Sequence, residues 1–226
     1  MALAEAGAAV AVGARRVDRL EDLVERIEKG GGKAIAVPLD VADEDAAHAF
    51  VNTAASQLGR LDVLVNNAGA MLLGPFEEAD SEEWRRMIDA NVYGVLYCTA
   101  AVLPVMRRQG SGHIVNVSSI AGRSASANSA VYNLTKFGVS GFSEALRQEV
   151  REAGIRVTAL EPGYVETELR EHITSEAGLE GQRNAKEALG DALTSEDMAR
   201  IIVFTVSQPQ RVSLSEILVR PTGQVR

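Results

Sequence analysis

The chain has 226 residues, 46% of them hydrophobic and 24% charged, which indicates one soluble globular domain with a substantial core. Its 23 basic and 31 acidic side chains give a formal net charge of −8, so a nucleic acid would be repelled. One cysteine and three scattered histidines argue against a disulfide framework and a metal site, and no run approaches the roughly 18 apolar residues of a membrane span. We therefore expect a cytoplasmic protein without nucleic acid, metal or membrane as a partner.

Short apolar runs alternate with longer stretches of helical periodicity along the chain. We predict strands over residues 8–13, 34–39, 61–65, 113–117, 155–160 and 216–219, and helices over 17–29, 44–58, 81–108, 130–152 and 195–207. Ser81 is expected to cap the third helix, and an irregular stretch of about thirty residues should precede the last helix. The alternation predicts a doubly wound parallel α/β sheet in a single domain over residues 1–226.

Polar or turn-forming residues follow several of the predicted strands. Residues 66–69 (NNAG) follow the strand LDVLV, residues 118–119 (SS) follow the next strand, and residues 162–163 (PG) follow the one after that. Ligands of a doubly wound sheet bind outside the carboxyl ends of its strands. These three segments are therefore the first candidates for a functional site.

A tyrosine and a lysine on one helix supply the chemistry. Tyr132 and Lys136 are four residues apart, so on the helix predicted there they share a face. A nearby ammonium group favours phenolate, and we expect Lys136 to lower the pKa of Tyr132. The two residues then form an acid/base pair suited to proton transfer near neutral pH.

Taken together, these motifs resemble the short-chain dehydrogenase/reductase family, and the resemblance runs the length of the chain. It implies a Rossmann-like fold and an oxidoreductase that interconverts a carbonyl and an alcohol on a small molecule. Further segments resemble the branch that contains clavulanate-aldehyde reductases and serine or 3-hydroxy-acid dehydrogenases: MLLGP, SSIAGR, TKFG, ETELREHIT and EILVRPT. This branch suggests a small polar or acidic substrate.

The resemblance also implies catalytic roles. Tyr132 protonates the carbonyl oxygen, Ser119, thirteen residues earlier, hydrogen-bonds that oxygen, and Lys136 also binds the cofactor ribose. Ser118 is the alternative serine, and we favour it as a structural turn hydroxyl. Asn91 would sustain a water-linked proton path to the lysine, and its alternative interpretation is a solvated side chain.

Further residues match the cofactor contacts of the family. Asn66, Ala68 and Gly69 would form a wall of the cofactor site, with Asn67 mainly stabilising the sheet. Asp40 and Val41 would contact adenine, although Asp40 is equally suited to cap the next helix. The nicotinamide carboxamide would lie against the segment after the fifth strand, through Pro162, Gly163, Val165 and Thr167.

Two arginines favour NADP(H) over NAD as the predicted cofactor. Family members that use NAD usually carry an acidic residue after the first visible strand, where this chain has Ala14, followed by Arg15 and Arg16. Guanidinium groups suit a 2′-phosphate, so we expect NADP(H), with Arg15 as the principal contact and Arg16 as a secondary one. The alternative is a solvated arginine pair.

The substrate pocket should be bounded by Met71 and its neighbours, by Arg123, and by a loop that begins with Tyr164 and extends over about residues 163–193. Met71 is equally compatible with ordinary packing. We hypothesise that Arg123 or Arg170 meets a substrate carboxylate. The resemblance further implies a homodimer or homotetramer joined through the two long helices and the last strand.

One family feature is missing. The family's first strand and its Thr-Gly-x-x-x-Gly-x-Gly turn, which binds the cofactor pyrophosphate, have no counterpart in the sequence. We expect either a truncated or mis-started enzyme, which we favour, or a degenerate member that serves as a binding or assembly module. A sugar-nucleotide epimerase is disfavoured, and the absence of Gly-x-Ser-x-Gly argues against a serine hydrolase.

Overall fold

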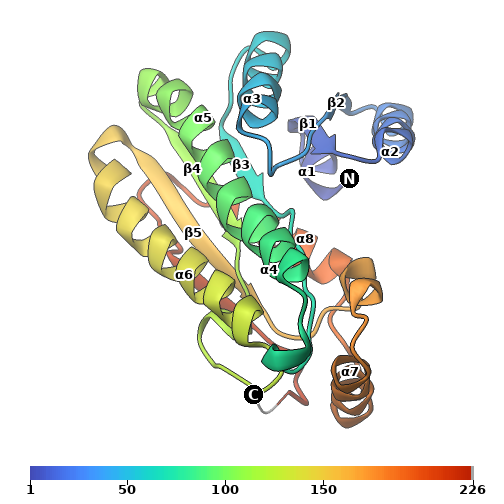
Figure 1. Cartoon of the computed structure of the whole chain (residues 1–226). Coiled ribbons are helices and arrows are strands. Elements are labelled where there is room, and N and C mark those ends of the chain that lie inside the picture. The colour runs from blue at the N-terminus through green and yellow to red at the C-terminus, as the bar shows by residue number, and fades with distance from the viewer. Residues whose placement is uncertain (225–226) are drawn as a thin grey trace.

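The computed structural model describes residues 1–224, which alternate between strands and helices as the sequence predicts. The strands are β1 (Ala9–Ala14), β2 (Lys33–Pro38), β3 (Val63–Asn66), β4 (Gly112–Val117), β5 (Ile155–Pro162) and β6 (Glu216–Val219). The α-helices are α1 (Ala2–Glu5), α2 (Val17–Lys29), α3 (Glu44–Leu58), α4 (Ser81–Ile88), α5 (Gly94–Gln109), α6 (Ala130–Val150), α7 (Glu176–Leu189) and α8 (Ser195–Val206) (Figure 1). The stretch expected to be irregular thus contains α7.

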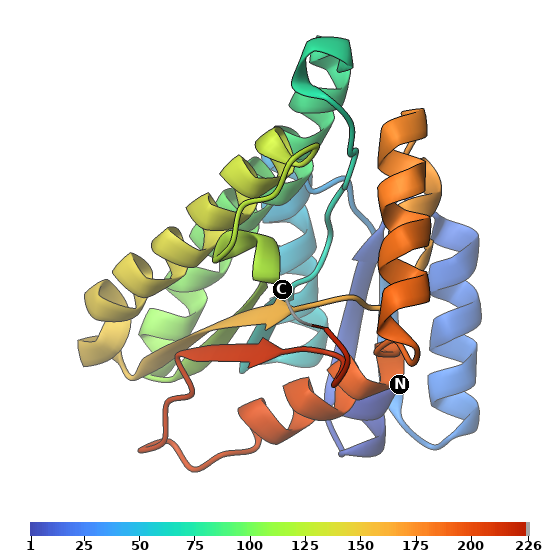
Figure 2. The ribbon, with the colours of Figure 1, turned by 90° about the horizontal axis from the view of Figure 1, so that it is seen from below.

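The strands form two parallel groups. β1 pairs with β2, whereas the larger sheet has the order β3-β4-β5-β6. Within residues 1–224 no strand connects β1 to β3, which is where the predicted missing strand would lie. Figure 1 shows β1 and β2 grouped with α1 and α2 beside the larger sheet. In Figure 2, α8 runs beneath β6 toward the N-terminus, where it packs against α1.

The main core lies where α3, α5 and α6 meet the larger sheet. Its fully buried members come from each of these elements and include Val51, Val102, Met106, Ile114, Val150 and Val157. Apolar side chains from sheet and helices thereby fix the ends of β3, β4 and β5 relative to α6. The doubly wound parallel α/β prediction is confirmed for this arrangement.

The long helical run before β4 contains a local irregularity. α4 and α5 are continuous through a π-helical segment, Asp89–Tyr93, and Asp80 rather than Ser81 caps the run by accepting a hydrogen bond from the Glu82 N–H at 3.0 Å. Length and composition would allow Ser81–Gln109 to cross a membrane. However, α5 packs against α3, β3 and β4, as a core helix does. The π-helical segment directs Asn91 into the interior, where it is 1% exposed.

Candidate active site

One large cavity opens at the carboxyl ends of the strands. Its volume of about 2130 Å³ exceeds the roughly 300–1,000 Å³ of ordinary small-molecule sites, because it continues between β1 and β3. Most of the predicted site residues line it: Arg16, Val41, Asn66, Ala68, Gly69, Met71, Asn91, Ser119, Tyr132, Lys136, Pro162, Gly163, Tyr164, Val165 and Thr167. Arg15, Asp40 and Arg123 are not among the lining residues.

Ser119, Tyr132 and Lys136 form a compact group in this cavity. β4 ends just before Ser119, whose hydroxyl accepts a hydrogen bond from the Ala121 N–H at 3.1 Å and is hydrogen-bonded to the side chain of Tyr132. Tyr132 and Lys136 lie one turn apart on α6, with Lys136 Nζ 5.7 Å from the centre of the tyrosine ring. All three side chains are largely buried. The structure thus brings together the three residues that the sequence predicts as the acid/base group.

Burial governs the protonation of this group. It raises the pKa of Tyr132, although the hydrogen bond with Ser119 and the charge of Arg170 act in the opposite direction. It also lowers the pKa of Lys136 to about 8, while Nζ donates a hydrogen bond to the Val117 carbonyl at 2.9 Å. The expectation of a lowered tyrosine pKa was therefore wrong, because desolvation of the phenolate dominates. Near neutral pH Tyr132 carries its proton and Lys136 is mostly charged.

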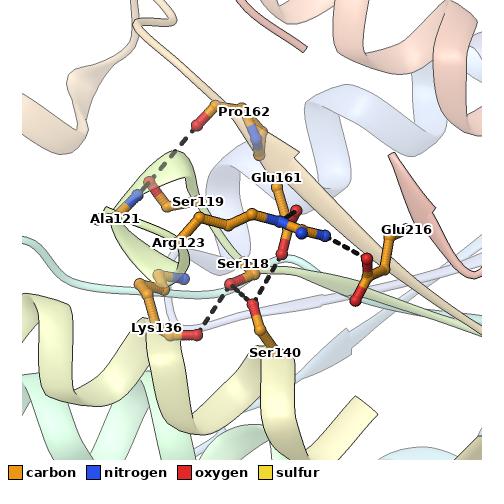
Figure 3. Close-up of polar contacts among 9 residues, drawn as sticks. All are labelled: Ser118, Ser119, Ala121, Arg123, Lys136, Ser140, Glu161, Pro162 and Glu216. Atoms are coloured by element: carbon orange, nitrogen blue, oxygen red, sulfur yellow. Dashed lines mark hydrogen bonds and ion pairs between the residues drawn. The ribbon is translucent and has the colours of Figure 1, made fainter. Parts of the chain in front are cut away.

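The two serines after β4 have different surroundings (Figure 3). The Ser118 hydroxyl donates to the Lys136 carbonyl at 3.0 Å and lies 2.9 Å from the Ser140 hydroxyl, so it ties the strand end to α6. The Ser119 hydroxyl instead donates a 3.5 Å hydrogen bond to the Pro162 carbonyl, and it also interacts with the side chain of Tyr132. This geometry favours Ser119 over Ser118 as the serine that contacts a reacting group.

Asn91 connects two walls of the cavity. Its Oδ1 accepts a hydrogen bond from the Ala70 N–H at 2.7 Å, and its Nδ2 donates to the Ala70 carbonyl at 2.9 Å and to the Thr135 hydroxyl at 3.1 Å. A solvated side chain, the alternative interpretation, is thereby excluded. The side-chain amide holds the loop after β3 against α6, beside Lys136.

The two asparagines at the end of β3 have different surroundings. Asn66 is buried and donates to Thr99 Oγ1 at 3.2 Å and to Asn116 Oδ1 at 2.8 Å, which ties β3 to β4 and α5. Asn67 is exposed and lines the cavity. The prediction that Asn67 mainly stabilises the sheet was wrong, because the alternation of the strand turns Asn66 inward. At Gly69 a Cβ would lie 3.0 Å from Asn91 Oδ1, so a side chain there would crowd the site.

The predicted contacts for the nucleotide end of the cofactor are less fixed. Arg16 lines the cavity and forms a 3.0 Å ion pair with Glu168, which Arg19 shares at 2.7 Å. Arg15 is exposed and lies outside the cavity lining. Asp40 accepts a hydrogen bond from the Ala42 N–H at 3.1 Å, within its own turn.

Arg123 lies away from the cavity, in a polar cluster behind Ser118 (Figure 3). Its guanidinium bonds both Glu161 and Glu216, and Glu161, which is 0% exposed, also accepts a hydrogen bond from the Ser140 hydroxyl at 2.9 Å. The assignment of Arg123 to the substrate pocket is corrected accordingly, because two carboxylates occupy its guanidinium. Sequence reasoning missed Glu161; its signal was an acidic residue within an otherwise apolar strand end.

The segment after β5 closes the cavity on its remaining side. Gly163 N–H donates to the Val219 carbonyl at 2.7 Å, and Val165 forms a bridge with Leu193. Tyr164 is buried and its ring stacks on Arg170. Met71 packs in an apolar cluster with Tyr132, so it combines the packing and lining roles that the sequence left open.

Comparison with known proteins gives the same picture. Residues 1–178 match the family model described as short chain dehydrogenase. An uncharacterized oxidoreductase of Staphylococcus saprophyticus is 40% identical over 225 residues, covering 98% of this chain and 89% of that protein. A serine dehydrogenase in its closed form, complexed with NADP+, superposes with a TM-score of 0.88 at 32% identity, covering 98% and 88% of the two chains. A gluconate 5-dehydrogenase of Burkholderia cenocepacia, complexed with NADP and tartrate, gives 0.85 at 26% identity, covering 97% and 87%.

The fold, the grouping of Ser119, Tyr132 and Lys136, and these matches agree with the resemblance predicted from the sequence. Serine dehydrogenases, named in the predicted branch, are among the similar structures. The chain belongs to the short-chain dehydrogenase/reductase family of oxidoreductases.

Proposed function

We propose that the protein is an NADP(H)-dependent oxidoreductase that interconverts a carbonyl and an alcohol on a small polar metabolite. The observation that carries this proposal is the Ser119–Tyr132–Lys136 group, buried at the edge of a cavity of about 2130 Å³. The cavity extends from this group to Arg16, just after β1. The similarity to structures that are complexed with NADP supports the choice of cofactor.

The residues beside Lys136 fit the nicotinamide and ribose part of the cofactor, whereas the turn that binds the pyrophosphate in the family has no counterpart in the sequence. Gly69 keeps the wall beside Asn91 and Lys136 free of a side chain, so a flat ring can lie close to the backbone. Lys136 has unused ammonium donors for ribose hydroxyls beyond its bond to Val117. When bound, the cofactor supplies or accepts the hydride at the substrate carbon.

The proton that the carbonyl oxygen receives comes from a side chain of this protein. In the reductive direction Tyr132 Oη donates its proton to the carbonyl oxygen, and the Ser119 hydroxyl donates a hydrogen bond to the same oxygen. The raised pKa of Tyr132 keeps that proton in place near neutral pH. Lys136 lies 5.7 Å from the tyrosine ring, and its charge stabilises the phenolate that remains. The apolar side chains of Met71, Leu72 and Ile173 exclude water around Tyr132.

The residues just after β1 are expected to determine whether the protein prefers NAD or NADP. Ala14 stands where an acidic residue would bind the 2′-hydroxyl of NAD, and Arg15 and Arg16 follow it directly. We assign both to the 2′-phosphate of NADP, with Arg16 the better placed because it lines the cavity. Binding of this phosphate would compete with Glu168 for Arg16.

Exposed apolar side chains support an oligomer. Tyr93 and Leu96 on the α5 side, Leu134 and Phe137 on α6, and Leu218 on β6 are between 36% and 66% exposed. These are the elements through which we expect a homodimer or homotetramer to assemble, with the tetramer favoured. Light scattering of the purified protein would test this: a monomer at micromolar concentration contradicts it.

A second candidate, a binding or assembly module without catalysis, is favoured by one observation. Within residues 1–224, β1 and β3 have unpaired edges that face the cavity. Fluorescence titration with NADPH and NADH separates the two functions. The oxidoreductase predicts saturable binding with NADPH preferred, followed by NADPH oxidation with a panel of small carbonyl compounds. Folded protein that neither binds nor oxidises NADPH would leave the module as the function.

A further inference from the structure

A chain of polar contacts runs behind the cavity from β5 to α6 (Figure 3). Glu161 in β5 accepts a hydrogen bond from the Ser140 hydroxyl at 2.9 Å, and the Ser140 hydroxyl lies 2.9 Å from that of Ser118. Ser118 in turn contacts the main-chain carbonyl of Lys136 at 3.0 Å. Glu161 is not among the residues that line the cavity, so it would touch neither substrate nor cofactor.

The chain of contacts ends where the acid/base group is held. Lys136 is fixed at two points by the end of β4: its Nζ donates to the Val117 carbonyl at 2.9 Å, and its carbonyl meets the Ser118 hydroxyl. The Ser118 N–H donates to the Leu160 carbonyl at 2.7 Å, which ties the same strand end to β5. Ser119 follows directly along the chain. The position of Ser119 relative to Lys136 therefore depends on how Ser118 is held.

Close packing keeps the two hydroxyls in this arrangement. Gly122 ends the short 3-10 helix that follows Ser119. A Cβ at Gly122 would lie 2.7 Å from Ser140 Oγ and 2.8 Å from both Ser118 Oγ and the Lys136 carbonyl oxygen. The backbone of Gly122 thus packs directly on the middle of the chain of contacts. The hydroxyls have little room to turn to other partners, so their hydrogen bonds are directed within the chain.

The count of hydroxyl protons shows why a charge matters at Glu161. Ser118 and Ser140 supply two protons for three contacts. Glu161 forms an ion pair with Arg123 and, as a carboxylate, can only accept, so the Ser140 proton points toward it. Ser140 then offers a lone pair to Ser118, which shares its one proton between Ser140 and the Lys136 carbonyl. An amide in place of the carboxylate could donate as well as accept, and this order would be lost.

We propose that Glu161 is a positioning residue for the acid/base group and acts through the two hydroxyls of this chain. Its carboxylate directs the hydrogen bonds that hold Lys136 and the end of β4 beside Tyr132. This inference rests on the proposed function and adds to it a residue outside the cavity. A small displacement of a reacting group slows the reaction while the group itself stays present. The expected signature is a slower reaction with little change in ligand binding.

The kinetic test compares Glu161→Gln, Ser140→Ala and the double variant with the wild type. NADPH oxidation is followed with the best substrate from a panel of small carbonyl compounds. We expect kcat to fall about threefold to tenfold in each single variant, as for the loss of one oriented hydrogen bond, with KM and the Kd for NADPH nearly unchanged. Because both side chains act through one chain of contacts, the double variant should be no slower than Ser140→Ala.

Glu216→Gln is the matched control. Glu216 is the other carboxylate partner of Arg123 but is not part of the hydroxyl chain, so this variant should keep the wild-type kcat. Melting temperatures are measured for every variant, because a purely structural role would lower stability and leave kcat of the folded protein unchanged. A wild-type kcat in folded Glu161→Gln, losses that multiply in the double variant, or a raised KM at unchanged kcat each overturns the inference.

Amide hydrogen exchange keeps this inference separate from the proposed function. Two N–H groups report on the strand end: that of Ala121 donates to the Ser119 hydroxyl at 3.1 Å and that of Gly122 to the Ser119 carbonyl at 2.8 Å. We expect both to exchange at least about threefold faster in Glu161→Gln than in the wild type or Glu216→Gln, well below the melting temperatures. Equal exchange in the three proteins overturns the inference. If the wild type reduces no carbonyl compound, the proposed function fails, while exchange still decides whether Glu161 holds this segment.

Discussion

The larger sheet and the β1–β2 group hold their polar residues in different ways. Asn66 at the end of β3, Asn91 in the π-helical segment beside it and Glu161 in β5 are buried and hydrogen-bonded within the protein. At the ends of β1 and β2, Arg15 and Asp40 are exposed, and Asp40 bonds only within its own turn among the contacts observed. We infer from this difference that the proposed acid/base group is held in place without a ligand, whereas the contacts proposed for the nucleotide would form on binding.

The largest predicted effect is a loss of carbonyl reduction on substitution of Tyr132. Tyr132→Phe removes the proton donor and keeps the ring that packs with Met71. We expect carbonyl reduction to fall by about 10²- to 10⁴-fold, the usual contribution of a general acid, with NADPH affinity unchanged. Stopped-flow measurement of NADPH oxidation checks the rate, and Tyr97→Phe on α5 serves as the control. Retention of full turnover by Tyr132→Phe would refute the mechanism.

A buried histidine in the larger sheet should make the stability of the protein depend on pH. His113 in β4 is 1% exposed, its Nε2 lies 2.8 Å from Thr158 Oγ1, and burial, with the charge of Arg156, lowers its pKa to about 4. The unfolded chain therefore binds more protons than the folded one between about pH 6.5 and pH 4, and stability falls as pH falls through this window. The loss from this residue reaches about 3 kcal/mol near pH 4. Urea unfolding of the wild type and His113→Gln should show a steeper pH dependence for the wild type; parallel curves would contradict it.

Charge reversal just after β1 tests whether the exposed arginines there bind the cofactor. Arg16→Glu should weaken NADPH binding by about tenfold to a hundredfold and leave NADH binding unchanged, because it removes a 2′-phosphate contact. Arg15→Glu should have a smaller effect, since Arg15 does not line the cavity. Arg19→Gln, which also pairs with Glu168 but lies outside the cavity lining, is the matched control. Equal losses of NADPH and NADH binding would remove the arginines from cofactor selection.

The smallest predicted effect concerns the cluster behind the site. Glu161→Gln keeps the shape of a fully buried side chain but removes the charge that faces Arg123. We expect a loss of about 1–3 kcal/mol in the free energy of unfolding, because Arg123 then has Glu216 as its remaining carboxylate partner. Glu216→Gln, whose side chain is 46% exposed, should cost under about 1 kcal/mol. Equal effects of the two changes in urea unfolding would show that burial of Glu161 does not matter.

The sequence predicts the order of strands and helices and the grouping of Ser119, Tyr132 and Lys136, because strand ends and helical spacing are visible in it. It does not predict which way neighbouring side chains turn. Strand alternation turns Asn66 into the interior and leaves Asn67 exposed, and Arg123 pairs with Glu161, which is 38 residues away along the chain. The pKa of Tyr132 also depends on burial, which the spacing of Tyr132 and Lys136 does not reveal.

Isotope transfer tests the central proposal most directly. Reduction of a panel of small polar carbonyl compounds with NADPH deuterated at the transferable C4 position is followed by mass spectrometry and proton NMR of the products. We predict that the wild type yields an alcohol with deuterium on the carbinol carbon and that Tyr132→Phe yields almost none. A product without deuterium at that carbon, or equal product from Tyr132→Phe, would contradict the proposed oxidoreductase and its acid/base group.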